Sequence, residues 1–363
     1  MKILYVFADT PQELNCSTHN CFNPTNAINK SSEHHADYIH TSVFIENNEE
    51  TQKLVTSADL VILERNVFSD CLTALTFWKV RGQNFAIIFD DGYHCMHPKN
   101  VSYGFWHDNE VKGVDAEGKE IIGKIFPPVL EQLKWGIAMS KGLQTVSQAL
   151  CDYWQPVNDT YLIHNHLVIE NYLDVKPLYK HEGDIWIGWN GSLSHLDSFE
   201  SSGLLNAFRK IVRKYKNVKI LISGDKRIYD AINVAPNKKI FSPFVPANQF
   251  PPLVKSLDIS TIPLFGEYDH CRSQIKPLEC MALKVPFLAT NFPNYNHLAP
   301  YGNFTENGWS NWEEKLSDMI ENLPMYKEKA NEVGFPFALT QNIDLHVDER
   351  INLYQKLIDK PYR

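Results

Sequence analysis

Residues 258–290 read DISTIPLFGEYDHCRSQIKPLECMALKVPFLAT, and this stretch decides the fold. It opens on a β-branched run that predicts a short strand, and a loop follows. Ser273 offers an N-cap oxygen and Pro277 is tolerated only in a first helical turn, so a helix is predicted from there to about Leu283. Residues 285–289 predict the next strand. This order places the loop and the helix N-terminus at the carboxyl edge of a parallel sheet, where ligands bind.

Charged residues at this helix start suit a nucleoside diphosphate. The free N–H groups and partial positive charge of a helix N-terminus favour phosphate, and Arg272 and Lys276 add full positive charge at the same end. Glu279 lies three residues after Lys276 and is expected on nearly the same helix face. Its carboxylate would repel phosphate but could accept hydrogen bonds from ribose hydroxyls. An ordinary amphipathic helix with surface charges is the alternative.

The pattern S-x-x-K-P-L-E-C-M-A-L-K-V-P-F-L-A-T at 273–290 resembles the nucleotide-sugar-binding signature of GT-B glycosyltransferases. The resemblance is to the large, mostly retaining group that includes sucrose and glycogen synthases. That group usually carries two glutamates eight positions apart, and Glu279 matches the second. Cys271 occupies the position of the first glutamate, and Lys284 that of a usual glycine. The family's usual contact from the first glutamate to the donor sugar is therefore not carried over.

Length and composition fit a soluble protein of two domains. The chain has 363 residues, a charged share of 21% and a formal net charge of −8, so its surface as a whole does not attract nucleic acid or anionic membrane. The seven cysteines include no C-x-x-C pair, which indicates reduced thiols. No signal peptide and no membrane-spanning run is recognised, so a cytoplasmic location in a bacterial or infected host cell is expected.

Strands and helices alternate through both halves of the chain, which predicts α/β domains with parallel, doubly wound sheets. The GT-B resemblance implies two Rossmann-like domains facing a cleft. The first, at 1–165, would bind the acceptor, and the second, at 183–335, the nucleotide sugar. A linker is expected at 166–182, and a C-terminal helix at 336–363 is expected to cross back to the first domain. The strands predicted in the first domain are residues 3–7, 38–44, 60–63, 85–89, 142–146 and 161–165.

Two adjacent carboxylates, Asp90 and Asp91, follow the strand at 85–89, and G-Y-H-C-M-H-P comes next. Carboxylates at a strand's carboxyl end are costly unless they bind or catalyse something. Asp91 is the candidate base for an acceptor hydroxyl, with Asp90 and His94 as further catalytic candidates. One aspartate capping a turn is the alternative, and a metal site from these three residues and His97 is another.

The second half restarts the pattern with a strand at 185–189 followed by N-G-S-L-S-H. A Gly191 turn lets backbone N–H groups approach a phosphate. The resembled family usually has Gly-Arg and a nearby lysine here, and this chain has Ser192 and His195, so the pyrophosphate clamp is expected to rest mainly on the two cations at the helix start. His195 is expected to substitute in part for the missing cation. The resemblance also implies that residues near Phe244 and Val245 hold the nucleotide base, although Phe244 is equally suited to a core. The full donor set is Gly191, Ser192, His195, Phe244, Val245, Arg272, Ser273, Lys276 and Glu279.

The GT-B resemblance implies a glycosyltransferase that moves a sugar from a nucleotide sugar to an acceptor hydroxyl, and because GT-B enzymes as a class do not need a bound metal, no metal or other cofactor is expected. The acceptor, the donor, the stereochemistry and the oligomeric state stay open. Several motifs look most like GT-B proteins of phage genomes, some of which modify hydroxymethylated bases in DNA. A basic helix and the aromatic-rich segment 99–126 could serve a duplex and a flipped base. The basic residues are Arg209, Lys210, Arg213, Lys214, Lys216 and Lys219.

Other readings keep the fold and change the chemistry. A glycan, lipid-linked or small-molecule acceptor is the alternative to DNA. Loss of the first glutamate and of the Gly-Arg pair also motivates a non-catalytic GT-B module that only binds a nucleotide. A third reading is an epimerase that acts on a nucleotide sugar without any acceptor.

Overall fold

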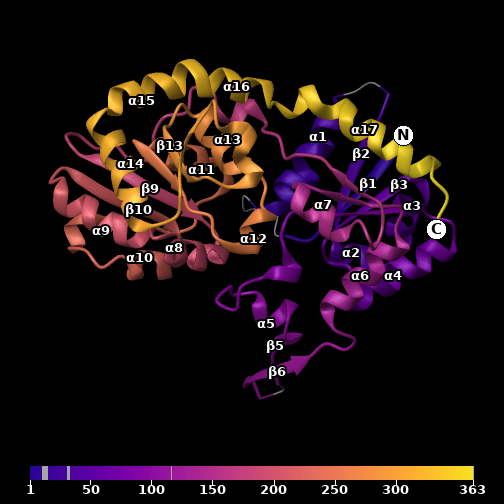
Figure 1. The fold of residues 1–363 in the computed structure, drawn as a ribbon. Coiled ribbons are helices and arrows are strands. Elements are labelled where there is room, and N and C mark those ends of the chain that lie inside the picture. The colour runs from indigo at the N-terminus through magenta and orange to yellow at the C-terminus, as the bar shows by residue number, and fades with distance from the viewer. Residues whose placement is uncertain (10–14, 31–32, 116, 363) are drawn as a thin grey trace.

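The computed structural model describes residues 1–9, 15–30, 33–115 and 117–362, and it shows two α/β domains side by side (Figure 1). Each domain is built on a six-stranded sheet in which every neighbouring pair of strands is parallel. Helices cover the sheets, as parallel strands connected by crossover helices require. The fold class predicted from the sequence is confirmed, since this architecture is that of the GT-B fold.

The first sheet has the strand order β2-β1-β3-β4-β7-β8. The order reverses between β1 and β3, so the loops after these two strands diverge and leave a crevice at their carboxyl ends. The strands are β1 (Lys2–Phe7), β2 (His35–His40), β3 (Leu60–Glu64), β4 (Phe85–Ile88), β7 (Leu143–Thr145) and β8 (Thr160–Leu162). The helices are α1 (Asn23–Asn29), α2 (Thr41–Glu46), α3 (Glu49–Ser57), α4 (Ser69–Val80), α5 (Tyr103–Trp106), α6 (Val129–Met139) and α7 (Gln148–Trp154).

The second sheet has the order β11-β10-β9-β12-β13-β14, and its reversal lies between β9 and β12. Residues 258–290 therefore begin with β12, one of the two strands at this second crevice. The strands are β9 (Ile185–Gly191), β10 (Val218–Gly224), β11 (Lys239–Ser242), β12 (Ile259–Ile262), β13 (Phe287–Thr290) and β14 (Asn303–Thr305). The helices are α8 (Leu196–Ser202), α9 (Leu204–Lys214), α10 (Lys226–Ala231), α11 (Phe250–Lys255), α12 (Gly266–His270), α13 (Ile275–Ala282), α14 (Trp309–Glu321), α15 (Leu323–Lys329) and α16 (Phe335–Thr340).

The last helix, α17 (Val347–Asp359), returns along the top of the molecule to the first domain (Figure 1). Tyr354 on this helix shares a hydrogen bond with Tyr5 of β1, with 2.7 Å between the two hydroxyl oxygens. Leu353 and Leu357 are buried in the same cluster as strand β1. The chain segment before β9 packs against the second domain, because Leu167 and Tyr172 belong to the core of that domain.

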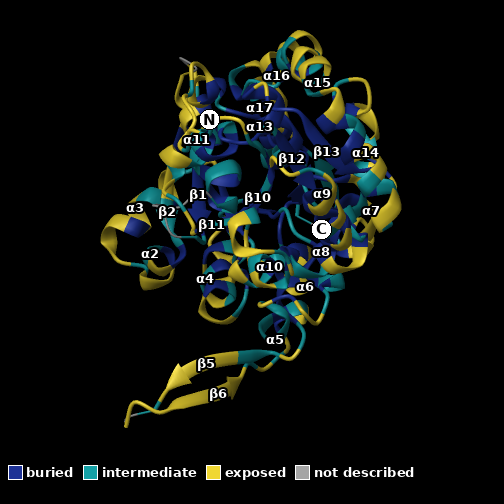
Figure 2. Ribbon diagram, turned by 90° about the vertical axis from the view of Figure 1, so that its left-hand side faces the viewer, coloured by how far each residue is buried: buried dark blue, intermediate teal, exposed yellow. Residues whose placement is uncertain are grey.

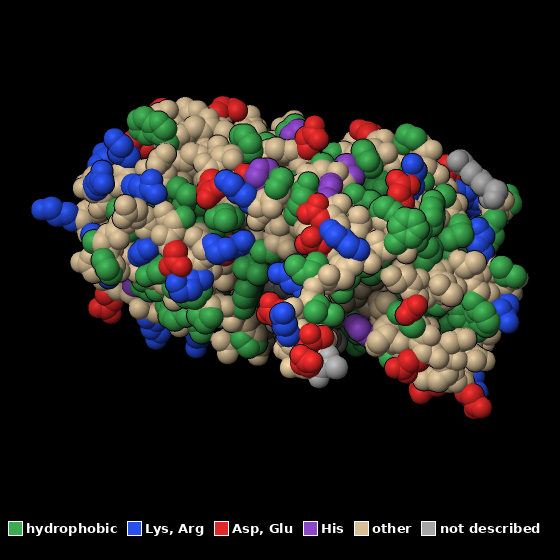
Figure 3. All heavy atoms as spheres, turned by 90° about the horizontal axis from the view of Figure 1, so that it is seen from below, with side chains coloured by type: hydrophobic (Ala, Val, Ile, Leu, Met, Phe, Trp, Pro, Cys, Tyr) green, Lys and Arg blue, Asp and Glu red, His purple; other side chains and the backbone are tan. Residues whose placement is uncertain are grey.

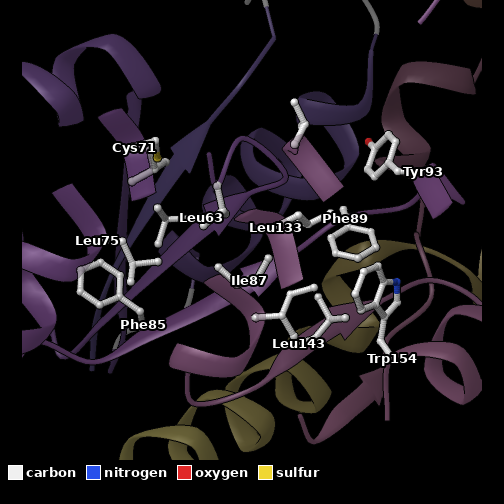
Figure 4. Packing of buried hydrophobic residues seen from close by; sticks show 14 of the residues in the cluster. Leu63, Cys71, Leu75, Phe85, Ile87, Phe89, Tyr93, Leu133, Leu143 and Trp154 are labelled. Atoms are coloured by element: carbon white, nitrogen blue, oxygen red, sulfur yellow. The ribbon is translucent and has the colours of Figure 1, made fainter. Parts of the chain in front are cut away.

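The core of the first domain holds β4 rigidly, and β4 carries the paired aspartates. Every residue of this strand is buried, and the strand packs among side chains of β3, α4, α6 and β7 (Figure 4). Just beyond it, the ring of Phe89 contacts that of Trp154 edge-on, with 5.8 Å between centroids. The segment after β4 therefore leaves the sheet from a fixed position.

Two local predictions differ from the structure. Residues 38–44 do not form one strand, because β2 ends at His40 and α2 begins at Thr41. The His40 ring caps that helix by accepting a hydrogen bond from the Ser42 N–H at 3.2 Å, and Phe44 turns into the core. The aromatic-rich segment 99–126 is predicted to pass over the cleft, and the structure divides it: residues 100–102 and Trp106 line the cleft, but β5 (Glu110–Val114) and β6 (Glu120–Lys124) form a hairpin that projects away from the body (Figure 2).

Within the described residues, no helix is both long enough and apolar enough to span a membrane.

Candidate functional site

A cleft of about 640 Å³ lies between the two domains and is lined by residues from both. The nine donor candidates from the second domain all line it, and so do Asp90 and Asp91 from the first. They follow the carboxyl ends of β4, β9, β11 and β12, as the crevice geometry of parallel sheets predicts. His94, the remaining catalytic candidate, is not among the described residues that line the cleft.

Arg272 is held in place by several acceptors of the second domain. Its Nε donates to Asp269 Oδ1 at 2.5 Å, and its Nη2 donates to the carbonyl oxygen and the hydroxyl of Ser194 at 3.2 and 3.0 Å. The guanidinium also lies over the ring of Tyr268, 4.7 Å from its centroid. A guanidinium with this many fixed contacts presents its positive charge to a ligand in one orientation.

Asp269 is the buried anchor of this arrangement. Its second oxygen accepts hydrogen bonds from the Ser198 hydroxyl at 2.6 Å and from the Phe265 N–H at 2.7 Å. With both oxygens occupied, the buried Asp269 side chain has hydrogen-bond partners for its polar atoms. Asp269 lies within the loop predicted at 263–272, where the structure forms the short helix α12. Sequence reasoning missed its role because nothing in the local pattern separates a buried aspartate from a loop aspartate.

His195 supports Arg272 instead of replacing a cation. The Arg272 Nη1 donates to His195 Nε2 at 3.0 Å, so this ring nitrogen has no proton. Burial, together with the charges of Arg272 and Lys276, holds the pKa of His195 well below its usual range. A neutral imidazole cannot supply positive charge to the clamp, which corrects the expectation that His195 substitutes for the missing cation.

Lys276 and Glu279 lie in the first turns of α13, and both face the cleft. The Lys276 ammonium donates to the carbonyl oxygen of Asn190 at 2.5 Å, and burial lowers its pKa to about 8. Burial raises the pKa of Glu279, whose Oε1 accepts a hydrogen bond from the Tyr172 hydroxyl at 3.2 Å. A cation with depressed pKa beside an open cleft is stabilised when an anion binds there.

The helix cap differs from the prediction. Gln274, not Ser273, is the N-cap residue of α13, and the Ser273 hydroxyl accepts only a long bond of 3.4 Å from the Ile275 N–H. Pro277 does lie in the first turn of the helix. Because Ser273 lines the cleft and caps the helix only weakly, its hydroxyl is available to a ligand.

Two glycines on the donor side of the cleft lie where a larger side chain would overlap its neighbours. A Cβ on Gly191 would lie 2.8 Å from the Lys276 ammonium nitrogen and 2.5 Å from the Trp189 ring. Gly224 has a φ of +94°, and its Cβ would lie 2.1 Å from the carbonyl oxygen of Gly191. The ring of Phe244 lies beside Gly224 and is 56% exposed, so it is a free aromatic face at the cleft and not a core residue. Ser192 and Val245 line the same side.

Asp90 and Asp91 face this clamp from the first domain. Burial, followed by the charges of Asp91 and Glu64, raises the pKa of Asp90 to about 7. The Asp90 Oδ1 is buried and has no hydrogen-bond partner among the described residues. Asp91 is close enough to Tyr268 that its charge raises the pKa of that phenol, after burial as the larger cause. Asp91 therefore lies on the donor side of the pair.

Arg65 is a cleft residue that sequence reasoning missed. It follows the buried strand β3 with a φ of +27°, and its guanidinium pairs with Asp9 and, at 3.6 Å, with Glu64. Glu64 is fully buried and also accepts bonds from the Ser17 hydroxyl and from the Asn20 amide at 3.1 Å. The signal was a Glu-Arg pair directly after an apolar run at the first sheet's crevice. Arg65 places positive charge on the acceptor side.

The four-residue metal site considered from the sequence does not form. The His97 ring pairs with Asp197 at 3.5 Å, while Asp90 and Asp91 cluster with Cys16 and could hold an ion with it. His94 points elsewhere, because its ring stacks on Tyr153 with 3.5 Å between centroids.

The basic residues considered for DNA lie outside the cleft. The four of them on α9 and the two that follow are absent from the described cleft lining. Several are engaged locally: Lys214 pairs with Glu321 at 3.4 Å, and Lys219 pairs with Asp184 at 2.7 Å. On the face shown in Figure 3, Lys and Arg side chains are interspersed with Asp and Glu. Within the part of the chain that the structure describes, these basic residues therefore do not share the cleft with the paired aspartates.

Comparison with known families matches residues 186–322 to the family described as Glycosyl transferases group 1. The matched region holds β9, β12, α13 and hence the Arg272 clamp. No curated protein matches the sequence.

Solved structures share the whole two-domain fold at low sequence identity. HepE of Anabaena, solved in complex with UDP and glucose, has 14% identity and a TM-score of 0.62, over 98% of this chain and 99% of HepE. Sucrose-phosphate synthase of Thermosynechococcus elongatus has 10% identity and a TM-score of 0.65, over 98% of both chains. A UDP-N-acetylglucosamine 2-epimerase has 12% identity and a TM-score of 0.55, over 99% of this chain and 98% of the epimerase. The shared fold alone does not separate transfer from epimerisation.

Proposed function

We propose that this protein is a glycosyltransferase that transfers a sugar from a nucleoside diphosphate sugar to an acceptor hydroxyl; in support, residues 186–322 match the Glycosyl transferases group 1 family and the chain has the GT-B fold. One observation carries the proposal. The oriented cations Arg272 and Lys276 of the second domain and the carboxylates Asp90 and Asp91 of the first line one interdomain cleft. Leaving-group stabilisation and proton acceptance are the two tasks that sugar transfer requires.

The donor diphosphate binds at the start of α13 in this proposal. Arg272 and Lys276 neutralise the charge that grows on the phosphate as the sugar leaves, which is electrostatic stabilisation of the transition state. These two side chains supply the positive charge, so the transfer is assigned no metal or cofactor. Glu279 accepts hydrogen bonds from ribose hydroxyls, and the exposed face of Phe244 stacks on the base. The HepE complexes with UDP make a uridine nucleotide the first donor to test.

The acceptor hydroxyl gives its proton to the paired aspartates. Asp91 is the base in this proposal because it is the carboxylate close to Tyr268 on the donor side. Burial raises the pKa of Asp90 to about 7, so below that pH the pair holds one negative charge rather than two. Attack from the aspartate side, opposite to the leaving diphosphate, would invert the anomeric centre, and the anomeric configuration of the product decides this point.

A small hydroxylated acceptor or a sugar chain end fits the cleft better than duplex DNA. The cleft volume of about 640 Å³ must hold both the donor and the acceptor. The basic residues of α9 that would bind a duplex are not among the described residues that line this volume, and Lys214 pairs with Glu321. A hydroxymethylated base in DNA remains the alternative acceptor, and the experiment below includes it.

The test combines donor binding with turnover. UDP, GDP and ADP are screened by thermal shift, and the nucleotide that stabilises the protein names the donor class; at a hundred times its Kd the added stability is about 2.7 kcal/mol. Release of that nucleoside diphosphate from its sugar conjugates is then measured with mono- and oligosaccharide acceptors and with hydroxymethylated DNA. Arg272→Met should lose binding, and the control Arg209→Met, on α9 outside the cleft, should retain it.

The outcomes separate the proposed activity from its competitors. Transferase activity requires a glycosylated acceptor, and Asp91→Asn should abolish it while leaving nucleotide binding intact. An isomerised nucleotide sugar formed without any acceptor would indicate an epimerase. Binding without turnover, unchanged in Asp91→Asn, would indicate a non-catalytic module and would refute the proposal.

A further inference from the structure

A cluster of two thiols and an imidazole joins the two domains beside the cleft. His94 and Cys95 follow the paired aspartates in the first domain, and Cys271 directly precedes Arg272 in the second. One ligand atom from each of the three residues lies within 4.8 Å of the other two. All seven cysteines of the chain are free, so neither thiol is used in a disulfide.

The spacing of the two sulfurs fits a shared metal ion. The Sγ atoms of Cys95 and Cys271 are 3.9 Å apart. Two thiolates bound to a tetrahedral zinc ion at about 2.3 Å lie about 3.8 Å from each other. A disulfide instead needs about 2.05 Å between the sulfurs, so they would have to approach by nearly half the observed distance.

Gly92 gives both sulfurs the space that they occupy. A Cβ on Gly92 would lie 2.8 Å from the Cys95 sulfur and 2.9 Å from the Cys271 sulfur. Only a glycine at this position allows both sulfurs to occupy their places. The Cys271 backbone is also fixed, because its carbonyl oxygen accepts a hydrogen bond from the Ser147 hydroxyl of the first domain at 3.0 Å.

The imidazole is oriented and has an unused nitrogen. The His94 ring stacks on Tyr153, nearly parallel to it at 14°, which restricts its rotation. Its Nδ1 is buried and makes no hydrogen bond within the described parts of the chain. Cys95 and His94 are only half-buried, so an ion from solvent can reach the cluster. One nitrogen of this oriented ring lies within 4.8 Å of both sulfurs, so the three side chains can reach one ion.

We propose that His94, Cys95 and Cys271 bind one thiophilic divalent cation, of which Zn²⁺ is the physiological representative, and that this ion links the two domains. Both thiols release their protons to solvent on binding, and the imidazole coordinates through a neutral nitrogen. Two thiolates and one dication leave the site without net charge. Water completes the tetrahedral coordination.

The ion acts on the position of the domains and takes no part in the transfer. Cys271 is the residue before Arg272, so fixing its sulfur to the first domain fixes the start of the donor clamp relative to the paired aspartates. This site therefore does not depend on the proposed activity. It also gives a use to the cysteine that stands where the resembled family has its first glutamate.

Cobalt(II) titration of the complete protein tests the proposal directly. One equivalent should bind and produce thiolate-to-cobalt absorption in the near ultraviolet, and Zn²⁺ should displace it. Cys95→Ser and Cys271→Ser should each weaken binding at least tenfold and reduce the charge-transfer band. The control Cys151→Ser, at a thiol outside the cluster, should bind cobalt as the wild type does. Cadmium NMR of the wild type, which needs no variant to fold, should report two sulfur ligands.

Three results would overturn the proposal. The first is the absence of a thiolate-cobalt band from the reduced wild type. The second is a band that survives both substitutions and disappears in Cys16→Ser, which would place the ion with Asp90 and Asp91 in the cleft. The third is a Cys95–Cys271 disulfide in the protein after air oxidation together with no cobalt binding after reduction, which would make the pair a redox element.

Discussion

Arg272 donates a hydrogen bond to His195, with 3.0 Å between Nη1 and Nε2. The bond leaves the imidazole neutral, with its proton on Nδ1, and makes it a positioning residue for the guanidinium. His195→Ala should therefore weaken binding of the preferred nucleoside diphosphate about tenfold, since hydrogen bonds to charged groups contribute about 1.5–3 kcal/mol. His195→Gln, which can still accept the bond, should recover most of the affinity in isothermal titration calorimetry.

The same relationship sets the pH response of that binding. Because the pKa of His195 lies well below its usual range, lowering the pH from 7.5 to about 5.5 should leave this residue neutral. Binding that strengthened over this interval in the wild type and not in His195→Ala would contradict the neutral imidazole. His97→Ala, which removes a histidine paired with Asp197 on the surface, is the matched control.

Lys276 should take up a proton when a diphosphate binds. Burial lowers its pKa to about 8 in the empty cleft, and a bound anion raises it again. At pH 8.5 the free protein therefore holds less than one proton on Lys276 and the complex holds nearly one. Calorimetry in buffers of different ionisation enthalpy should detect this uptake, and Lys276→Met should abolish it together with most of the affinity. Proton release at this pH would refute the assignment.

Because of Asp90, we expect the free energy of unfolding to fall as the pH rises. Its pKa is raised by burial and by two neighbouring carboxylates to about 7, against 3.8 for an ordinary aspartate. The folded state then keeps a proton that the unfolded state has lost, so the free energy of unfolding falls between about pH 4 and pH 7. Asp90→Asn should remove this loss and stabilise the protein at pH 8 by roughly 2–4 kcal/mol.

Urea unfolding of both proteins at pH 4.5 and pH 8 measures this difference. The advantage of Asp90→Asn should be much smaller at pH 4.5, which lies only slightly above the ordinary aspartate pKa of 3.8, because most of the stability is lost between there and pH 7. An equal effect at both values would attribute it to the substitution itself and not to the titration of Asp90.

The donor side of the cleft was accessible from the sequence because its residues are close together along the chain. Arg272, Lys276 and Glu279 are close together in the sequence at the start of one helix. Helix geometry alone therefore predicts that they lie near the same helix end. Gly191 and Phe244 follow other strands of the same sheet, and the crevice rule for parallel strands brings them to the same edge.

What the sequence did not indicate depends on contacts between distant segments. His195 and Arg272 are 77 positions apart, and only packing decides that they bond instead of acting as two separate cations. The direction of His94 likewise depends on stacking against Tyr153. The strand predicted at 38–44 failed for a local reason, since β-branched residues predict a strand while the His40 cap starts a helix.

Gly224 and Gly183 are a matched pair of positions for testing whether the donor side of the cleft requires a glycine at position 224. Both have positive φ, +94° and +73°, so alanine is strained at either position by about 1 kcal/mol. A Cβ at Gly183 would meet nothing within 4 Å, but one at Gly224 would lie 2.1 Å from the carbonyl oxygen of Gly191. Gly224→Ala should cost about 2–4 kcal/mol in urea unfolding and weaken nucleotide binding. Gly183→Ala should cost only the backbone strain and bind normally; equal costs would contradict the overlap.

The return of α17 to the first domain can be tested at its buried hydroxyls. The Tyr354 hydroxyl bonds both to the Tyr5 hydroxyl at 2.7 Å and to the Gln144 Oε1 at 3.1 Å, and all three side chains are buried. Tyr354→Phe leaves two buried groups without a partner, whereas Tyr5→Phe removes only one bond. We expect Tyr354→Phe to cost about 2–4 kcal/mol in urea unfolding and Tyr5→Phe about half of that.

The double variant should cost little more than Tyr354→Phe alone, because Tyr5→Phe removes the hydroxyl that the first change left unpaired. Additive costs would show that α17 is held by its apolar face and that the hydroxyl pair contributes nothing of its own.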